Sequence, residues 1–199
     1  MLYKQRERFN KISIKVGIIF SKFGLSPNQW TLLTLLPTFF ALYFLVNEQF
    51  LLSALFFIFA SFIDLVDGSV ARVTGRVTKK GAYLDTIMDR YVEGIIILGL
   101  LFVAIPSVYF PFYFWLFLYL IGGMMTTYAK AAAKEKGLVE KELKGGLLER
   151  AERLSLLFLG ILIAYFDKIY LSYIIVLLAI LTNISAFQRI FIAIRMSKE

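Results

Sequence analysis

Long runs of apolar residues, separated by short polar or charged turns, dominate the pattern along this chain. A helix needs about 20 mostly apolar residues to cross the hydrocarbon core of a bilayer. Runs of about this length predict helices near 28–46, 50–71, 82–105, 109–133, 147–166 and 169–192. The chain is 59% hydrophobic, with a mean hydropathy of +0.75, whereas a soluble domain is about 45–50% apolar. The pattern therefore predicts an all-α integral membrane protein built as a six-transmembrane-helix bundle.

The first 22 residues follow a different pattern, in which basic and apolar residues recur with a helical period. The basic positions are spaced by three or four, at Lys4, Arg8, Lys11 and Lys15. Such a segment is typical of an amphipathic helix that lies in the membrane interface. We therefore expect two parts, an amphipathic juxtamembrane helix over residues 1–22 and a six-helix membrane domain over residues 23–199, with no room for a second soluble domain.

Basic residues are distributed unevenly between the turns. The segments before the first, after the second, after the fourth and after the sixth expected helix are rich in Lys and Arg. The opposite turns contain a single lysine, Lys168. By the positive-inside rule, both termini should be cytoplasmic in a multi-pass protein of the cell membrane. The net charge of +8 then reflects this bias and attraction to anionic lipids, rather than nucleic-acid binding.

Two residue types are absent, and their absence restricts the possible chemistry. The chain contains no cysteine and no histidine. Disulfides, zinc sites of the Cys or His type and Ser-His or Cys-His nucleophile pairs are therefore excluded. The remaining metal ligands are oxygen atoms, which suit Mg²⁺, Mn²⁺ or Ca²⁺.

Four aspartates interrupt two of the apolar runs. Asp64 and Asp67 lie near the end of the second expected helix, and Asp85 and Asp89 lie near the start of the third. A carboxylate at membrane depth is costly by several kcal/mol unless a partner offsets its charge. The predicted orientation places both pairs at the cytoplasmic side.

The helical period brings each pair onto one face. Asp64 and Asp67 are three positions apart, and Asp85, Asp89 and Glu93 follow one another at intervals of four. A short connection makes the two helices antiparallel neighbours, so these faces can meet. Carboxylates that lie so close repel one another without a cation. We therefore expect a site for one or two divalent ions, open to cytoplasmic water and able to position phosphoryl oxygens.

Small residues accompany the aspartates. Gly68 and Gly81 remove side chains where a ligand or a helix backbone must approach closely, and Ala71 does the same on the aspartate face. Arg72 is placed to hold a phosphate or to brace an aspartate.

The whole spacing resembles the signature of the CDP-alcohol phosphatidyltransferases. It reads Asp-x-x-Asp-Gly-x-x-Ala-Arg, then eight residues, then Gly-x-x-x-Asp-x-x-x-Asp, and every fixed position matches within residues 64–89. The amphipathic leader, the number of expected helices and the sequence Ser26-Pro27-Asn28 with Thr31 extend the resemblance to most of the chain. Among the branches of this family, the chain looks most similar to the archaetidylinositol and phosphatidylinositol phosphate synthases.

The resemblance implies a reaction and a set of roles. A CDP-alcohol, usually CDP-diacylglycerol or its archaeal ether analogue, would bind with its diphosphate on one or two Mg²⁺ or Mn²⁺ ions. The acceptor hydroxyl would attack the phosphorus attached to the lipid, and CMP would leave. Asp64, Asp67 and Asp85 would be metal ligands, and Asp89 the general base and a possible ligand of a second metal. The CDP site would include Asn28, Thr31, Asp64, Asp67, Gly68, Ala71, Arg72, Gly81 and Asp85. The resemblance also implies a homodimer.

A group of basic residues at the fourth and fifth expected helices is a candidate binding site for the acceptor. Lys130 ends the fourth expected helix, and Arg150 and Arg153 open the fifth, three positions apart on one face. These residues resemble the inositol phosphate branch of the family, and together they could clamp a phosphate on the acceptor. Three neighbouring positions depart from the residues usual in that branch: Ala132, Lys134 and Ala151. Inositol phosphate is therefore the expected acceptor, with serine, glycerol phosphate and glycerol as alternatives.

Other readings of the same features remain open at this stage. CDP-inositol could be the donor in place of a CDP-lipid. Membrane prenyltransferases also use two aspartate-rich helices and Mg²⁺, although they usually have longer chains. A cation transporter would explain intramembrane acids, but here the acids gather at one side, and no pair of broken helices repeats in the two halves.

Overall fold

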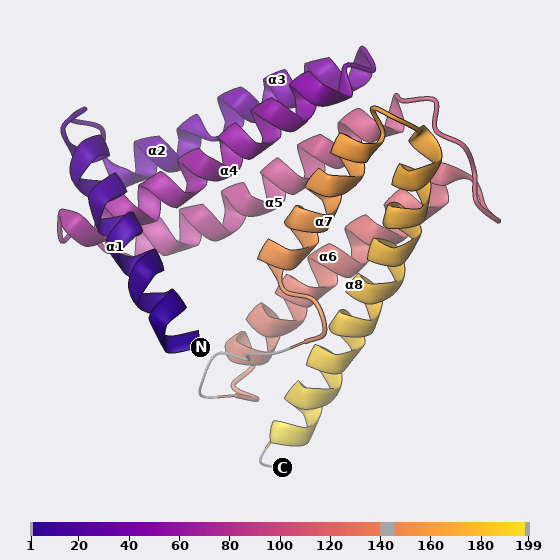
Figure 1. Cartoon of the computed structure of the whole chain (residues 1–199). Helices are drawn as coiled ribbons and strands as arrows, with labels where there is room; N and C mark the ends of the chain where they lie inside the picture. Colours follow the sequence, from indigo (N-terminus) through magenta and orange to yellow (C-terminus); the bar gives the residue numbers. More distant parts are fainter. Residues whose placement is uncertain (1, 140–145, 198–199) are drawn as a thin grey trace. The chain divides into compact units, whose positions relative to one another are not determined.

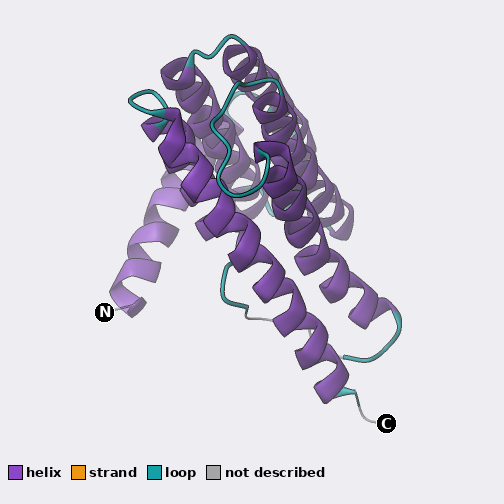
Figure 2. Ribbon diagram, turned by 90° about the vertical axis from the view of Figure 1, so that its right-hand side faces the viewer, coloured by secondary structure: helices purple, strands orange, loops and turns teal. Residues whose placement is uncertain are grey.

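The computed structural model describes residues 2–139 and 146–197, and within these ranges the chain is helical without a β-strand (Figures 1 and 2). Its described helices are α1 (Leu2–Ser21), α2 (Pro27–Leu33), α3 (Leu35–Val46), α4 (Phe50–Val73), α5 (Lys79–Leu101), α6 (Phe112–Glu135), α7 (Arg150–Ile163) and α8 (Lys168–Met196). The chain divides into two compact units. The first contains Met1–Leu45 and Leu52–Ile96, and the second contains Val46–Leu51 and Ile97–Glu199.

The first expected span is interrupted, because α2 ends at Leu33 and α3 begins at Leu35. Pro37 accounts for the break: it has no N–H to donate to the Leu33 carbonyl, and its ring crowds that carbonyl. The start of α2 is well defined, since the Ser26 hydroxyl accepts from the Gln29 backbone N–H while the Gln29 side chain accepts from the Ser26 backbone N–H. This reciprocal capping box fixes the first turn of α2.

Four segments of the described chain are helical, long enough and apolar enough to cross a membrane: Pro27–Val46, Phe50–Val73, Phe112–Glu135 and Lys168–Met196. Helices α5 and α7 are not among them. The first half of α5 carries too many charged side chains, and α7 has 14 residues, fewer than the roughly 20 that a perpendicular span needs. The all-helical fold is therefore confirmed, with four helical segments that could cross a membrane, whereas the count of six spans stays a prediction.

The first unit is organised around the contact of α1 and α2 with α4. Trp30 of α2 and three residues of α4, Ile63, Val66 and Val70, form a buried apolar cluster, on which Phe20 of α1 packs. Helix α1 approaches α4 closely at Gly17, where a Cβ atom would lie 2.5 Å from the Ser69 carbonyl oxygen. The amphipathic first helix is thus packed on the helix that carries Asp64 and Asp67.

The second unit is held together by α8, which packs against both α6 and α7. At Gly122 of α6, a Cβ atom would lie 2.5 Å from the Thr182 hydroxyl and 2.9 Å from the Asn183 backbone nitrogen. The Asn183 side chain donates to the Leu118 carbonyl at 2.9 Å. This combination of a small residue and a polar cross-link is a common way to join helices in a membrane.

Candidate functional site

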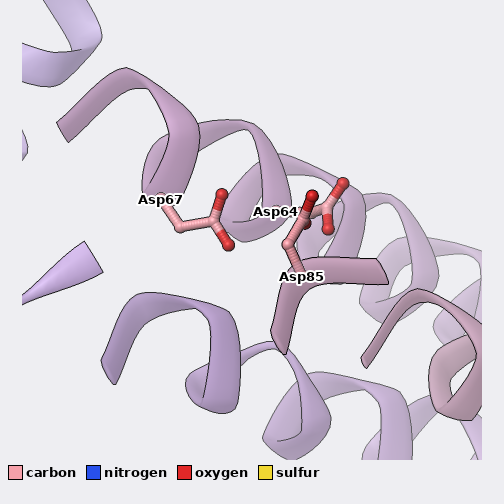
Figure 3. Close-up of side chains that lie close together, drawn as sticks. All are labelled: Asp64, Asp67 and Asp85. Atoms are coloured by element: carbon pink, nitrogen blue, oxygen red, sulfur yellow. The ribbon is translucent and has the colours of Figure 1, made fainter. Parts of the chain in front are cut away.

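Three carboxylates from two helices converge in the first unit (Figure 3). Asp64 and Asp67 lie in the second half of α4, Asp85 lies in the first half of α5, and one oxygen of each lies within 4.8 Å of one from each of the others. The sequence period explains the convergence, because residues three apart lie on one face of α4 and that face meets α5. The expected cluster of acids is therefore present in the described structure.

Asp67 is the most enclosed of the three, with 6% of its surface exposed. The Thr31 hydroxyl donates to Asp67 Oδ2 at 2.5 Å and also lies 3.1 Å from the Pro27 carbonyl. Helix α2 therefore reaches the acidic cluster and fixes one of its carboxylates. This contact explains why the first span belongs to the site.

The fourth aspartate lies apart from this group. Asp89 is half-buried one turn beyond Asp85 on α5, and it is outside the described group whose oxygens lie within 4.8 Å of one another. Glu93, which shares a face with Asp85 and Asp89, accepts a hydrogen bond from Arg90 Nη1 at 2.7 Å, and both side chains are largely buried. Glu93 therefore forms an ion pair with Arg90 within α5.

A cavity of about 340 Å³ lies beside the acids, wholly within the first unit. Residues expected at a CDP site line it: Asn28, Thr31, Asp67, Gly68, Ala71, Arg72, Gly81 and Asp85. Asp64 belongs to the acidic cluster but is not among the lining residues. The cavity volume is at the lower end of the range for small-molecule sites, about 300–1,000 Å³.

The cavity is also lined by Pro27, from the Ser26-Pro27-Asn28 sequence, and by four residues that the sequence pattern did not assign to the site: Arg76, Val77, Thr78 and Ala82. Thr78 precedes the first residue of α5, and its hydroxyl accepts from the Gly81 backbone N–H at 3.0 Å, as an N-cap does. A threonine immediately before a helix was the available clue. Arg76 was recognised only as a loop charge, although it adds a second cation to the wall formed by Arg72.

Two glycines of this wall lie close to polar side chains. A Cβ atom on Gly68 would lie 3.2 Å from Arg72 Nη1, and one on Gly81 would lie 3.1 Å from the Thr78 hydroxyl and 3.2 Å from Asn28 Oδ1. A Cβ atom at either position would require the neighbouring polar side chain to shift slightly.

The donor set fits a divalent cation. Oxygens on opposite sides of one ion lie about 4–5 Å apart, since Mg²⁺–O and Ca²⁺–O distances are roughly 2.0–2.6 Å. The three carboxylates lie within that span, at 4.8 Å or less, and a bound cation would relieve their mutual repulsion. All three are hard oxygen ligands, which favour Mg²⁺ or Mn²⁺ over softer metals.

The second unit contains a separate group of cations. Arg153 is 1% exposed, and its Nη1 atom lies 3.3 Å from the Thr126 hydroxyl. Arg189 Nη1 donates to the carbonyl of the same threonine at 2.8 Å. Lys130 lies one turn beyond Thr126 on α6, and Arg150 opens α7; both are half-buried. We refer to Lys130, Arg150, Arg153 and Arg189 as the basic cluster.

Arg189 was missed by the sequence reasoning, because a basic residue near the end of the last helix fits the positive-inside rule equally well. Only the packing of α8 against α6 and α7 places it with Arg153.

The family model for CDP-alcohol phosphatidyltransferase matches residues 25–195 of the chain. The chain belongs to this family. It is therefore an enzyme that transfers the phosphate-linked alcohol of a CDP-alcohol to an acceptor hydroxyl, with release of CMP. The match confirms the predicted reaction class and decides against the prenyltransferase and transporter alternatives.

Two relatives show which kinds of protein the chain is similar to. The chain is 30% identical to archaetidylinositol phosphate synthase of Pyrococcus horikoshii over 193 residues, which cover 96% of this chain and 95% of that protein. It is 32% identical to a bifunctional IPC transferase and DIPP synthase of Aquifex aeolicus, over 92% of this chain and 42% of the longer protein.

Solved structures of Mycobacterium tuberculosis phosphatidylinositol phosphate synthase share the fold. With CDP-DAG bound, that protein is 28% identical and superposes with a TM-score of 0.79, covering 92% of this chain and 94% of the other. Its complex with manganese and citrate gives a TM-score of 0.81 over 94% and 90% of the two chains.

Proposed function

We propose that this enzyme transfers a phosphatidyl or archaetidyl group from a CDP-lipid to the hydroxyl of inositol phosphate. The observation that carries the proposal is the placement of Asp67, Asp85 and Arg72 on one cavity, beside the third acid Asp64. Such a cavity offers a metal-binding edge and a cationic edge to a diphosphate. The M. tuberculosis relative solved with CDP-DAG bound supports a CDP-lipid as the donor.

The donor would lie with its diphosphate between the acids and the arginines. A divalent ion held by Asp64, Asp67 and Asp85 would polarise the phosphoryl oxygens and neutralise charge on the departing CMP. Arg72 and Arg76 line the same cavity and would bind the phosphates directly. Room for the nucleotide would be left by the small residues Gly68, Ala71 and Gly81. Thr31 fixes Asp67 by a hydrogen bond, and Asn28 lies beside Gly81 in the first turn of α5.

Asp89 is proposed as the general base. The acceptor oxygen forms a bond to the phosphorus that bears the lipid, the bond from that phosphorus to the CMP oxygen breaks, and the acceptor proton passes to the Asp89 carboxylate. The chain has no histidine, and a carboxylate can take the role of base in its place. Asp89 follows Asp85 by one helical turn, a spacing that separates a base from a metal ligand on the same face. A second ion could also be shared by Asp89.

The acceptor is proposed to bind through its phosphate at the basic cluster. Arg153 is held by Thr126 and is almost fully buried, so its guanidinium is preorganised. Arg189 is fixed through the same residue. Several cations close together match a phosphate dianion better than they match serine or glycerol, which carry no such group. The names of the Pyrococcus and Mycobacterium relatives, an archaetidylinositol phosphate synthase and a phosphatidylinositol phosphate synthase, agree with this choice.

The membrane arrangement is also proposed. Six spans, both termini in the cytoplasm and a site facing the cytoplasm follow from the distribution of basic residues between turns. Helix α1 would then lie in the cytoplasmic interface of the cell membrane as the juxtamembrane part, residues 1–22, with residues 23–199 as the membrane domain. The homodimer implied by the family resemblance stays a prediction.

One assay tests the proposal. Purified enzyme is incubated with Mg²⁺ or Mn²⁺, a CDP-lipid and, in separate reactions, inositol phosphate, serine, glycerol phosphate or glycerol, and CMP release is measured. Inositol phosphate should give the highest kcat/KM. A parallel set with CDP-inositol as donor is required, because the bifunctional Aquifex protein is about as similar as the other relatives. A preference for serine over inositol phosphate would refute the proposed acceptor. A preference for CDP-inositol over the CDP-lipid would refute the proposed donor.

A further inference from the structure

Arg72 is held in place by residues outside the cavity that it lines. It lies in the last turn of α4, where its side chain is exposed, and an exposed arginine ordinarily samples many rotamers. Here its Nη2 atom donates to the Ser13 hydroxyl of α1 at 2.7 Å and lies 3.3 Å from the Ser69 hydroxyl. The guanidinium is thereby directed along Gly68, towards the cavity.

The two serines form a chain of hydrogen bonds with a defined direction. The Ser69 hydroxyl donates its only proton to the Leu65 carbonyl at 2.7 Å. In the 2.8 Å contact between the Ser13 and Ser69 oxygens, Ser13 must therefore be the donor. Ser13 then accepts from Arg72, so that both hydroxyls donate and accept at once. Such chains strengthen each of their bonds.

The backbone of α1 is placed so that Ser13 can take part. Gly17 follows Ser13 by one helical turn, on the same face. A Cβ atom on Gly17 would lie 2.5 Å from the Ser69 carbonyl oxygen, so the close approach of α1 to α4 requires glycine there. The close approach of α1 to α4 is therefore specific to this face of α1. It lets Ser13 bond to Arg72, 59 positions further along the chain.

We propose that Ser13 is a positioning residue of the transferase, which holds Arg72 in the orientation that binds the diphosphate of the CDP-alcohol. This inference rests on the proposed donor site. It gives the amphipathic first helix a second role besides membrane attachment, because a hydroxyl from α1 completes the phosphate-binding wall.

A matched pair of variants tests the hydroxyl itself. Ser13→Thr keeps the hydroxyl as hydrogen-bond donor and acceptor. Ser13→Val has nearly the same shape as the threonine variant but has no hydroxyl. An open cavity of about 520 Å³ beside Ser13, Ile14, Arg72 and Val73 has room for the added methyl groups. Ser13→Val should raise the KM for the CDP-lipid about 3- to 10-fold, with the acceptor KM unchanged, and Ser13→Thr should restore the wild-type value. Equal donor KM values for the two variants would overturn the proposal.

A double-mutant cycle separates positioning from general packing. In an Arg72→Ala background, Ser13→Val should have no further effect on the donor KM, because the group that Ser13 positions is gone. An undiminished effect would show that Ser13 acts without Arg72 and would also overturn the proposal. Ser21→Ala is the control within α1, since the Ser21 hydroxyl donates within its own helix, to the Ile18 carbonyl. If the wild-type enzyme releases no CMP from any CDP-alcohol, the proposed function fails, whereas a change confined to Ser13 variants concerns this inference alone.

Discussion

Thr31 and Asp67 form the contact that ties the first membrane segment to the acidic cluster. The hydroxyl and the carboxylate oxygen are 2.5 Å apart, and both residues are buried. Residues that orient a metal-binding carboxylate commonly affect metal affinity almost as strongly as the ligands do. The Thr31 hydroxyl is therefore expected to set how tightly the divalent ion is bound.

Replacing Thr31 by Val removes this hydrogen bond while keeping the shape of the side chain. The concentration of Mn²⁺ that gives half-maximal activity should rise about 10- to 100-fold, and it can be measured by metal titration of CMP release. Thr38→Val is the control, because the buried Thr38 hydroxyl donates to the Thr34 carbonyl, one turn earlier on the same segment. An unchanged metal requirement in Thr31→Val would show that Thr31 does not orient a ligand.

Removing a single carboxylate from the cluster should abolish metal-dependent activity. Asp85→Asn leaves two charged ligands, and turnover should fall at least about 10²-fold with loss of the Mg²⁺- or Mn²⁺-dependent binding of CDP. The matched control is Asp167→Asn, because Asp167 caps α8 by accepting from the Ile169 N–H, and asparagine caps a helix equally well. Full activity of Asp85→Asn would argue against Asp85 as a ligand.

Asp89 should behave differently from the three clustered acids. Asp89→Asn should lower kcat about 10²- to 10⁴-fold, the usual contribution of a general base, while metal-dependent CDP binding measured by calorimetry stays close to wild type. Loss of nucleotide affinity in this variant would place Asp89 among the metal ligands instead of in the role of base.

The basic cluster should determine the affinity for the acceptor. Arg153→Lys and Arg189→Lys keep the positive charge but lose the planar fork of donors. Each should raise the acceptor KM about 10-fold, with a smaller effect on the donor KM. Arg195→Lys serves as the control on the same helix as Arg189, since Arg195 is exposed in the last turn of α8. If the acceptor KM does not change in either cluster variant, the cluster does not bind the acceptor.

The crossing of α6 and α8 should be sensitive to one methyl group. At Gly122, the added Cβ of an alanine would lie 2.9 Å from a backbone nitrogen, so α8 itself would have to move. Gly122→Ala should lower the free energy of unfolding by about 1–3 kcal/mol, seen as a lower melting temperature in detergent. Gly94→Ala is the control, because in the described structure no atom outside the neighbouring backbone of its own helix lies within 4 Å of the corresponding Cβ position. Equal melting temperatures would contradict the tight crossing.

Local patterns predicted the part of the site that two neighbouring helices supply. The spacing of Asp64, Asp67 and Asp85 was enough, because helical periodicity fixes the faces and a short turn fixes the pairing. The break between α2 and α3 was missed, although Pro37 was visible, because the apolar run continues across it. The expected count of six spans stays a prediction: four segments of the described chain qualify by length and hydropathy, and α5 is not among them because it combines the acids with an apolar second half.

Contacts between distant segments could not be predicted in this way. Arg189 reaches the Thr126 carbonyl 63 positions away, and Ser13 reaches Arg72 across 59. A basic residue near the end of the last helix and a serine in an amphipathic helix each have a sufficient local explanation, so neither pattern points to a partner. Their roles depend on how helices pack, which hydropathy and spacing do not encode.

The link between α4 and α5 comprises only residues 74–78, and this brevity bears on how the molecule is made. Closing a short loop sacrifices little chain entropy, and contacts between sequence neighbours form faster than remote ones. During synthesis, the hairpin that carries Asp67 and Asp85 can therefore assemble before α6, α7 and α8 have left the ribosome. The nascent chain would then be able to capture its metal ion at an early stage of insertion.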